Sequence, residues 1–395
     1  MEPVVIRLKR GRERPFVHGH PWVFSGAVDE FQGDPVVGSA AEVVAHDGAW
    51  LARGLLHPNA ALRVRLYTRD QAQPLDDAFF AARVDAACAL RERLFTEPER
   101  TNAYRLVFSE SDGLSGLVVD RYADVLSAEV SSAALVPFLP NILGRLAERA
   151  GTQRIRVAAS DDAVEREQLD PAALPVSSAP AQVRIVENGF RFDVDLRSGQ
   201  KTGFFLDQRM NRVRVASYAR GRKMLSAYCY TGGFEVCAAA GGAAKIVGVD
   251  RSEDALARAK AHHALNRTTA PVEYLKADVP DALRRFRDAG ETFDLVVLDP
   301  PRFVANRAQM EKGLRAYKDI NLLAMKLLAP SGILATFSCS GQVSAEDFKT
   351  MVGWASVDAG RTVRILETLG QPPDHPVLAV FPESEYLKGL ICCVE

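Results

Sequence analysis

The chain has 395 residues, of which 47% are hydrophobic and 25% are charged, with a formal net charge of -1. This length exceeds one ordinary domain, and we expect two or three. No apolar run reaches the roughly 18 residues needed to cross a bilayer, and the charged start MEPVVIRLKRGRER argues against a secretory signal. Six cysteines without a repeated CxxC spacing argue against a disulfide framework or a zinc site, so we expect no metal and a cytoplasmic location.

The first 70 or so residues contain short strand-like runs with no helical period. The runs are PVVIRL, WVFSGAV, AEVVAH, AWLARGLL and ALRVRLYT. Turn residues such as Gly33-Asp34-Pro35 and Asp47-Gly48 separate them. This pattern predicts a small β-barrel.

The middle of the chain mixes helix and strand signals. From Asp76 to Thr96 the apolar residues recur at helical spacing, which predicts an amphipathic helix. The runs ESDGLSGLVVDRY and ADVLSAEV are typical of two strands around a turn. The Pro/Ser/Ala stretch at 169–181 is the clearest candidate for a linker.

Strands and helices alternate after residue 185. The predicted strands are RKMLSAY, KIVGVD, VEYLKAD, FDLVVLD and GILATFSC. The predicted helices are EDALARAKAHHALN, PDALRRFRDA, the long segment after Asn306 and SAEDFKTMVGWASVDAG. His262 and His263 lie in the middle of the first of these with no partner spacing, which indicates a solvated pair. This alternation predicts an open, doubly wound α/β domain, with the final runs VRILETLG and YLKGLICCVE pairing as an antiparallel edge.

A Gly-rich turn and three acids follow successive strands of this domain. TGGF comes after the first strand, but it is neither a GxGxxG motif nor a P-loop. Asp250, Asp278 and Asp299 end the second, third and fourth strands. Asp250 is placed to bind ribose hydroxyls and Asp278 an adenine amino group. A site for adenosine without phosphates predicts S-adenosylmethionine as the cofactor, with a Rossmann dehydrogenase as the alternative.

Cys339 ends the next strand along the chain, in the stretch ATFSCSGQ. Ligands of parallel sheets bind at the carboxyl ends of the strands, so Cys339 and Asp299 should face one pocket. A thiolate that adds to carbon-6 of a pyrimidine would activate carbon-5 for methylation. Cysteine is also a common buried filler, and position alone does not separate these two interpretations.

Basic residues cluster in two stretches. Lys9, Arg10, Arg12 and Arg14 lie near the N-terminus, and Arg197–Lys223 contains eight basic residues, Lys201 among them, against one acid. Such clusters are typical of a polyanion-binding surface, although a solvated basic face would give the same pattern.

Seven motifs together resemble the RlmI-type methyltransferases, class I enzymes that make 5-methylcytosine in large-subunit ribosomal RNA. They are SGQKTGFFLDQR, AYCYTGGF, VLDPPRFV, AYKDINLLAMKLL, TFSCSG, DHPV and FPESEYLKG. RGRERPFVHGHPWVFSGAV is similar to the PUA domain of that family, an RNA-binding barrel. The resemblance implies a PUA-like RNA-binding domain over 1–72, a central α+β domain over 73–183 and a methyltransferase domain over 184–395. It also implies ribosomal RNA as the partner and suggests a homodimer.

Carried over motif by motif, the resemblance makes Cys339 the nucleophile and Asp299 the acid beside the target base. It further implies cofactor contacts by a set of residues in three motifs: Phe205, Asp207, Gln208, Tyr230, Thr231, Gly232, Asp299 and Pro300. Pro300 is followed by Pro301 and Arg302, so no second thiol is available to help release the product. The group that removes the carbon-5 proton stays open, and Arg302 is expected either to bind phosphate or to lower the thiol pKa.

Two other functions fit parts of the pattern. A DPP motif followed by an aromatic residue can hold an exocyclic base amine for methylation, but Arg302 intervenes before Phe303. The chain could also be an RNA-binding assembly factor without catalysis, against which the acids and Cys339 argue.

Overall fold

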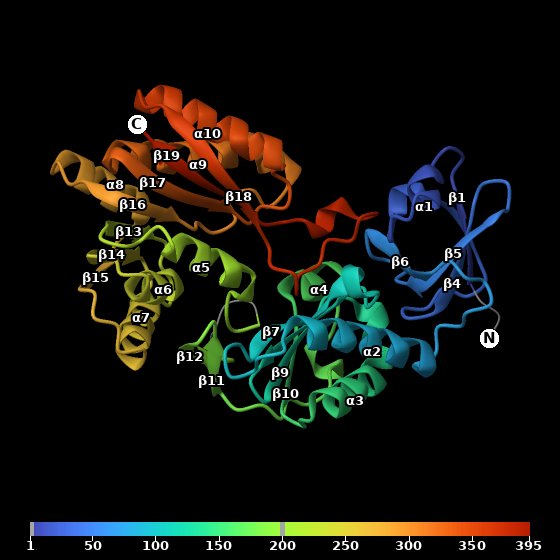
Figure 1. Cartoon of the computed structure of the whole chain (residues 1–395). Coiled ribbons are helices and arrows are strands. Elements are labelled where there is room, and N and C mark those ends of the chain that lie inside the picture. Colours follow the sequence, from blue (N-terminus) through green and yellow to red (C-terminus); the bar gives the residue numbers. More distant parts are fainter. Residues whose placement is uncertain (1–3, 198–201) are drawn as a thin grey trace. The chain divides into compact units, whose positions relative to one another are not determined.

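The computed structural model describes residues 4–197 and 202–395, which belong to two compact units (Figure 1). Each unit consists of three separate segments of the chain. Unit 1 comprises Met1–Ile185, Val194–Leu206 and Pro373–Ser384, and unit 2 comprises Val186–Asp193, Asp207–Pro372 and Glu385–Glu395. The chain therefore leaves and re-enters each unit.

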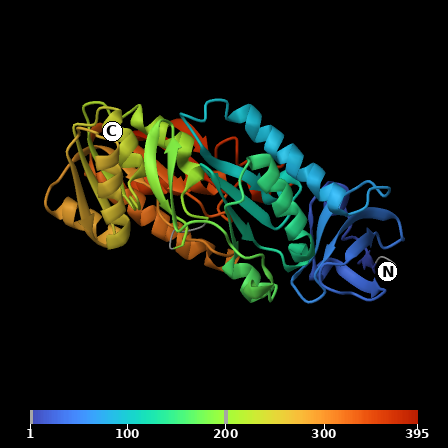
Figure 2. The ribbon, with the colours of Figure 1, turned by 90° about the horizontal axis from the view of Figure 1, so that it is seen from below.

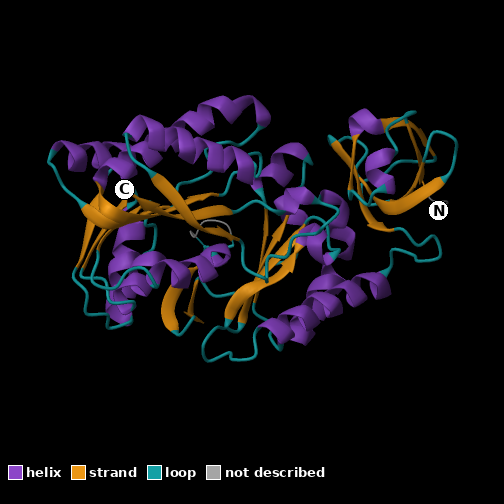
Figure 3. Cartoon of the chain, turned by 45° about the horizontal axis from the view of Figure 1, so that its top comes forward, coloured by secondary structure: helices purple, strands orange, loops and turns teal. Residues whose placement is uncertain are grey.

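Unit 1 begins with a six-stranded sheet that curls around its own hydrophobic core (Figure 3). The strand order is β2-β6-β5-β4-β1-β3. Inward side chains alternate with outward ones, as in β1, where every second residue is buried. The elements are β1 (Val4–Leu8), α1 (Arg14–Val17), β2 (Trp22–Phe24), β3 (Val28–Gln32), β4 (Ala40–Val44), β5 (Trp50–Leu56) and β6 (Leu62–Thr68).

The run WVFSGAV does not form the single strand that its composition predicts. β2 ends at Phe24, a 3-10 turn occupies Ser25–Ala27, and β3 begins at Val28. The break arises because β2 pairs with β6 whereas β3 pairs with β1, so the chain crosses from one partner to another within this run.

A four-stranded sheet in the order β10-β9-β8-β7 follows, and helices α2 and α3 pack side by side against it (Figures 1 and 2). The predicted helix over 76–96 is confirmed by α2, whose first turn is capped by Asp76 accepting from the amide of Phe79 at 2.8 Å. The elements are α2 (Asp77–Leu94), β7 (Ala103–Phe108), β8 (Leu117–Tyr122), β9 (Val125–Val130), α3 (Leu139–Ala150), β10 (Ile155–Ala159) and α4 (Asp161–Arg166). A two-stranded sheet of β11 (Gln182–Glu187) and β12 (Phe190–Asp195) comes next.

The Pro/Ser/Ala stretch, predicted as a linker, covers the edge of β10. The amide of Ser178 donates to the carbonyl of Ile155 at 2.8 Å, and the Ser177 hydroxyl accepts from the amide of Val157 at 2.9 Å. These contacts satisfy backbone groups that an open edge strand would leave unpaired.

The late segment Pro373–Ser384 is anchored in unit 1 through Arg91. This side chain is fully buried and donates to both carboxylate oxygens of Asp112, at 2.6 and 2.8 Å. It also donates to the carbonyls of Arg105 and Asp374, each at 2.8 Å. The Asp374 carboxylate in turn accepts from the amide of Arg105 at 2.9 Å. One buried guanidinium thus holds two distant parts of the sequence together.

Unit 2 contains a seven-stranded sheet in the order β15-β14-β13-β16-β17-β19-β18. Helices α8, α9 and α10 lie on one face and α5, α6 and α7 on the other, with a hydrophobic core on each side (Figure 1). The strands are β13 (Lys223–Ala227), β14 (Lys245–Asp250), β15 (Val272–Lys276), β16 (Phe293–Leu298), β17 (Leu328–Ser338), β18 (Val363–Gly370) and β19 (Lys388–Val394). The helices are α5 (Arg209–Ala216), α6 (Gly233–Ala240), α7 (Glu253–Leu265), α8 (Val279–Asp288), α9 (Met310–Leu327) and α10 (Ala345–Ala359).

The first five strands of this sheet are parallel, as strand-helix alternation predicts. The predicted antiparallel pairing of the last two runs is also confirmed, but only β18 lies at the edge. β19 inserts between β17 and β18 and runs antiparallel to both.

Replacing Arg91 by methionine should strongly destabilise unit 1, because Asp112 would stay buried without its cation. We expect the free energy of unfolding to fall by about 3–5 kcal/mol. Denaturant titration would measure this, with Arg93→Met, at an exposed position of the same helix, as the control expected to change stability by no more than about 0.5 kcal/mol. Equal effects of the two substitutions would contradict the anchoring role of Arg91.

Candidate functional site

Three neighbouring parallel strands end along one edge of the sheet in unit 2. The register pairs Ala227 of β13 with Leu298 of β16, and Leu298 with Thr336 of β17. On the other side of β13, β14 ends at Asp250. After β13 the chain first adds strands on one side of it, β14 and β15, and then on the other side, β16 and β17. Open α/β sheets bind their ligands at the point where the strand order reverses in this way. The loops that follow these strands are therefore the candidate site.

The loop after β13 has an unusual backbone. Tyr228, Tyr230 and Gly232 all have positive φ, at 64°, 47° and 82°. For the two tyrosines this conformation costs on the order of 1–3 kcal/mol each, and such strain is typical of ligand-binding loops. Gly232 cannot be replaced easily, since a Cβ there would lie 2.9 Å from the Cβ of Ala259. The AYCYTGGF motif thus forms a tight loop at the carboxyl edge.

Asp250 holds this loop from the adjacent strand. Its carboxylate accepts from the amide of Tyr230 at 2.9 Å and from the amide of Ser252 at 2.9 Å. Asp278 follows β15 and caps α8, where it accepts from the amide of Asp281 at 3.4 Å. Burial raises the pKa of Tyr228, and the negative charges of Asp278, Asp319 and, least, Asp250 raise it further. Asp250 and Asp278 therefore both act on one side chain of the loop.

His262 also supports the loop, although its sequence context indicated a solvated residue. It is buried, and Nδ1 lies 2.8 Å from the carbonyl of Thr231 while Nε2 accepts from the amide of Asp193 at 3.0 Å. Burial lowers the pKa of His262, so the ring is neutral near pH 7. The prediction was wrong because His262 lies on the inner face of α7, which the mixed Ala/His sequence does not reveal.

The DPP motif after β16 is linked to the LDQR stretch. The side chain of Gln208 donates to Asp299 at 2.9 Å, and Asn211 donates to the Gln208 amide oxygen at 2.6 Å. The hydroxyl of Tyr386 donates to the carboxylate of Asp207 at 2.7 Å. Residues far apart in the sequence therefore meet around Asp299.

Cys339 follows the last residue of β17 and is partly exposed. Its Sγ lies 4.0 Å from the carbonyl oxygen of Pro300, so the thiol is next to the DPP motif as the strand order predicts. The neighbouring Ser340 is buried, and its hydroxyl lies 2.9 Å from that of Tyr317 and accepts from the amide of Val304 at 3.2 Å. These bonds fix the backbone that carries the thiol.

Lys388 is a component of this site that the sequence reasoning missed. It is the first residue of β19 and pairs with Ser338, the last residue of β17. Its Nζ donates to the carbonyls of Ser340 and Tyr386, at 2.7 and 2.8 Å. Burial lowers the pKa of Lys388 to about 8, and the nearby Cys339 and Glu385 act in the opposite direction. Lys388 is the lysine of the FPESEYLKG motif, but its place in the site follows only from the insertion of β19 beside β17.

The other residues predicted for the site and for RNA binding have the following positions. Thr231 is buried beside His262, and Phe205 belongs to unit 1. Arg302 is exposed directly after the DPP motif. Lys201 lies outside the described residues. The predicted RNA-binding residues near the N-terminus are all exposed on unit 1: Lys9, Arg10, Arg12 and Arg14.

The basic stretch Arg197–Lys223 is not one exposed face, contrary to its interpretation as a polyanion-binding cluster. Arg212 is buried and pairs with Glu187 at 2.5 Å. Arg214 pairs with Glu367 at 2.5 Å and Lys223 with Glu291 at 2.6 Å. Much of this positive charge is neutralised by acids that lie far away in the sequence.

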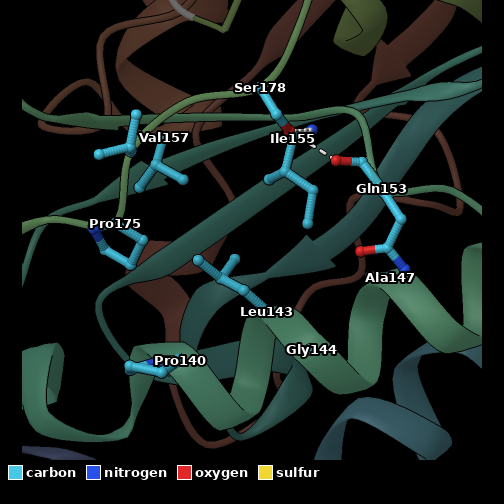
Figure 4. A pocket seen from close by; sticks show the side chains of 10 residues that line it. Pro140, Leu143, Gly144, Ala147, Gln153, Ile155, Val157, Pro175 and Ser178 are labelled. Carbon is cyan, nitrogen blue, oxygen red and sulfur yellow. Dashed lines mark hydrogen bonds between the residues drawn. The ribbon is translucent and has the colours of Figure 1, made fainter.

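A shallow hollow lies on unit 1 (Figure 4). Its volume is about 170 Å³, below the roughly 300 Å³ of typical ligand pockets. Leu143 and Ile155 line it, and the hydroxyl of Ser178 donates to the carbonyl of Gln153 at 2.6 Å at its rim. The hollow carries no charged group and offers no chemistry of its own.

Within residues 4–197 and 202–395, no set of three or more His, Cys, Asp or Glu side chains is arranged to hold a metal ion. None of the helices in the described part of the chain has the length and apolar character needed to cross a membrane.

Comparison with protein families gives two matches. Residues 158–390 match the model of S-adenosylmethionine-dependent methyltransferases, and residues 6–69 match a PUA-like domain. The first match covers more than half of the chain. The second covers the curled six-stranded sheet of unit 1.

Curated relatives and solved structures agree with these matches. The ribosomal RNA large subunit methyltransferase I of Shewanella amazonensis is 44% identical over 392 residues, which is 98% of this chain and 99% of that protein. The protein of the same name from an Enterobacter species is 41% identical over 399 residues, covering 99% of both chains.

A candidate SAM-dependent methyltransferase from Streptococcus mutans shares the fold, with a TM-score of 0.84 at 21% identity over 98% of this chain and 99% of that one. A candidate methyltransferase complexed with SAH matches with a TM-score of 0.83 at 21% identity over the whole of both chains. This chain therefore belongs to the S-adenosylmethionine-dependent methyltransferases, within the family of the ribosomal RNA large subunit methyltransferases I.

Proposed function

We propose that this chain transfers a methyl group from S-adenosylmethionine to carbon-5 of a cytosine in large-subunit ribosomal RNA, with Cys339 as the nucleophile. The observation that carries the proposal is the position of Cys339. A partly exposed thiol follows β17 at the edge where the parallel strands end, and it lies beside Pro300 of the DPP motif. The relatives are named ribosomal RNA large subunit methyltransferases, which supports ribosomal RNA as the substrate.

The residues at this edge fit an adenosine-containing cofactor. Asp250 ends β14 and Asp278 follows the adjacent strand β15, so we expect these two carboxylates to bind ribose hydroxyls and an adenine amine. We expect the loop residues Tyr230, Thr231 and Gly232 to border the cofactor. The linked side chains of Gln208 and Asp299 would bind on the other side, and we expect Phe205, Asp207 and Pro300 nearby. When bound, S-adenosylmethionine supplies an electrophilic methyl group on a sulfonium sulfur.

The chemistry of Cys339 follows from the weak nucleophilicity of cytosine carbon-5. The thiolate adds to carbon-6, a carbon–sulfur bond forms, and the electron pair of the 5,6-double bond moves to carbon-5. Carbon-5 would then take the methyl group with this electron pair, and the pair of the broken bond between the methyl group and sulfur would stay on sulfur, giving S-adenosylhomocysteine as the leaving group. Removal of the carbon-5 proton by a base restores the double bond and expels the thiolate, so the enzyme is regenerated. Covalent assistance of this kind divides one difficult substitution into easier steps.

We assign RNA recognition mainly to exposed basic residues that lie outside the basic stretch Arg197–Lys223. Lys9, Arg10, Arg12 and Arg14 lie on the PUA-like part of unit 1, and Arg302 follows the DPP motif. Arginine and lysine side chains of this kind bind phosphates without reading sequence. Two expectations from the sequence stay predictions: that Lys201 binds RNA and that the chain forms a homodimer.

Replacing Asp250 by alanine should weaken S-adenosylmethionine binding by about 1.5–3 kcal/mol, because charge-assisted hydrogen bonds to the ribose would be lost. Isothermal titration calorimetry measures the affinity. Asp254→Ala removes the same charge from an exposed position of α7 and should leave the affinity unchanged. Unaltered binding by a folded Asp250 variant would remove this residue from the site.

Neutralising Arg10, Arg12 and Arg14 together, each to glutamine, should weaken RNA binding and reduce its salt dependence. Each lost phosphate contact lowers the slope of log affinity against log salt by about 1. The matched control is the triple change of Arg93, Arg100 and Arg166 to glutamine, which removes equal charge from exposed positions of the same unit. Filter binding at several salt concentrations would reveal the difference. Equal losses in both triple variants would contradict a specific basic surface.

Replacing Cys339 by serine should lower methyl transfer at least about 100-fold while cofactor affinity changes little, since the lost interaction exists only along the reaction path. The wild-type enzyme should also form a denaturant-stable adduct with RNA that carries 5-fluorocytosine at the target, because fluorine cannot leave as a cation. Methylation assays and denaturing gels give the two measurements. Near-normal turnover by the serine variant would instead favour methylation of an exocyclic amine.

A further inference from the structure

Lys388 is a buried cation held beside the end of the strand that carries the thiol. Only 6% of the residue is exposed, and it faces Ser338 across the antiparallel pair of β17 and β19. Its ammonium donates to the carbonyl of Ser340, directly after Cys339, and to the carbonyl of Tyr386. An ammonium has three N–H donors, so these two bonds leave one for another acceptor.

The charge of Lys388 has no contacting carboxylate among the described residues. A buried ammonium without a counter-charge is costly, and burial accordingly lowers its pKa. Two neighbouring groups oppose this effect by their negative charge, first Cys339 and then Glu385. Ionised Cys339, whose backbone neighbour Ser340 accepts from this ammonium at 2.7 Å, is therefore the anionic partner that the position of Lys388 offers.

Four other titratable groups in the described part of the chain do not take this role. The hydroxyl of Tyr317, on α9, is bonded to Ser340, and burial raises its pKa, so it is neutral. Asp299 and Glu385 are acids, and their negative charge opposes a thiolate. Arg302 is exposed to solvent, where its field is screened.

We propose that Lys388 is a positioning residue whose ammonium stabilises the thiolate of Cys339 and so sets the fraction of reactive nucleophile near neutral pH. This inference rests on the proposed function, since it gives the thiol its use. The hydrogen bonds to the two carbonyls hold the ammonium in place, and the 2.7 Å bond to Ser340 fixes it next to the backbone of Cys339. An opposite charge within about 4–6 Å typically lowers the pKa of an acidic group by about 1 unit or more.

The test is the pH dependence of alkylation of Cys339 by iodoacetamide in the full chain, followed by mass spectrometry of the Cys339 peptide. Only the thiolate reacts, so the midpoint of the rate profile reports its ionisation. Lys388→Gln keeps two N–H donors for the carbonyls but removes the charge. We expect the midpoint to rise by about 1 unit and the rate near neutral pH to fall about tenfold. Lys349→Gln, at an exposed position of α10, should leave the profile unchanged.

Further measurements separate charge from shape. Lys388→Arg should restore the wild-type midpoint at least in part, and equal profiles for the glutamine and arginine variants would overturn the proposal. An unshifted profile in a Lys388→Gln variant that still binds S-adenosylmethionine would overturn it as well. If the substituted chains fail to fold, the wild-type profile decides, because a midpoint at or above the roughly 8.5 of free cysteine excludes stabilisation by Lys388.

Failure of this proposal and failure of the proposed function give different results. Alkylation needs neither RNA nor methyl transfer, so it reports the coupling of Lys388 to Cys339 directly. A shifted profile together with a serine variant of Cys339 that still methylates RNA would retain the coupling and reject the nucleophile. An unshifted profile together with a trapped 5-fluorocytosine adduct would reject the coupling and retain the nucleophile.

Discussion

The parallel register of β13, β16 and β17 is the constraint on which the site depends. Neighbouring strands lie about 4.8 Å apart, and the register aligns Ala227, Leu298 and Thr336 along one edge. The strained loop, the DPP motif and Cys339 begin within a few residues of these positions. A slip of one residue between two strands would turn every side chain to the opposite face and separate these groups. The hydrophobic cores on both faces of the sheet prevent such a slip.

The antiparallel strand β19 brings a different part of the sequence to this edge. An antiparallel strand starts where its parallel neighbours end, so Lys388, the first residue of β19, meets Ser338, the last residue of β17. Two residues earlier, the Tyr386 hydroxyl bonds to Asp207 and its carbonyl accepts from Lys388. The residues at the start of β19 therefore contact both the segment expected near the cofactor and the backbone around the thiol.

The sequence predicts those features that depend on local pattern. Asp250, Asp299 and Cys339 could be placed because each ends or directly follows a recognisable buried strand, and parallel strands must end at the same edge. Lys388 could not be assigned a role, because the pattern does not show that its strand inserts beside β17. His262 was misplaced because the Ala-rich sequence of α7 does not distinguish the inner face. The charge of Arg212 was misinterpreted because its partner, Glu187, lies in another segment.

The division of each unit into separate segments has a consequence for biosynthesis. Arg91 and Arg105 are translated early, whereas Asp374, whose carbonyl and carboxylate bind them, is translated only after the whole of 207–372. Domains that are continuous in sequence can fold one after another as the chain emerges from the ribosome. Unit 1 cannot complete its buried hydrogen bonds in that order. Arg91 can bind Asp112 early, but the hydrogen bonds to Asp374 stay unmade, or replaced by water, until almost all of unit 2 has been synthesised.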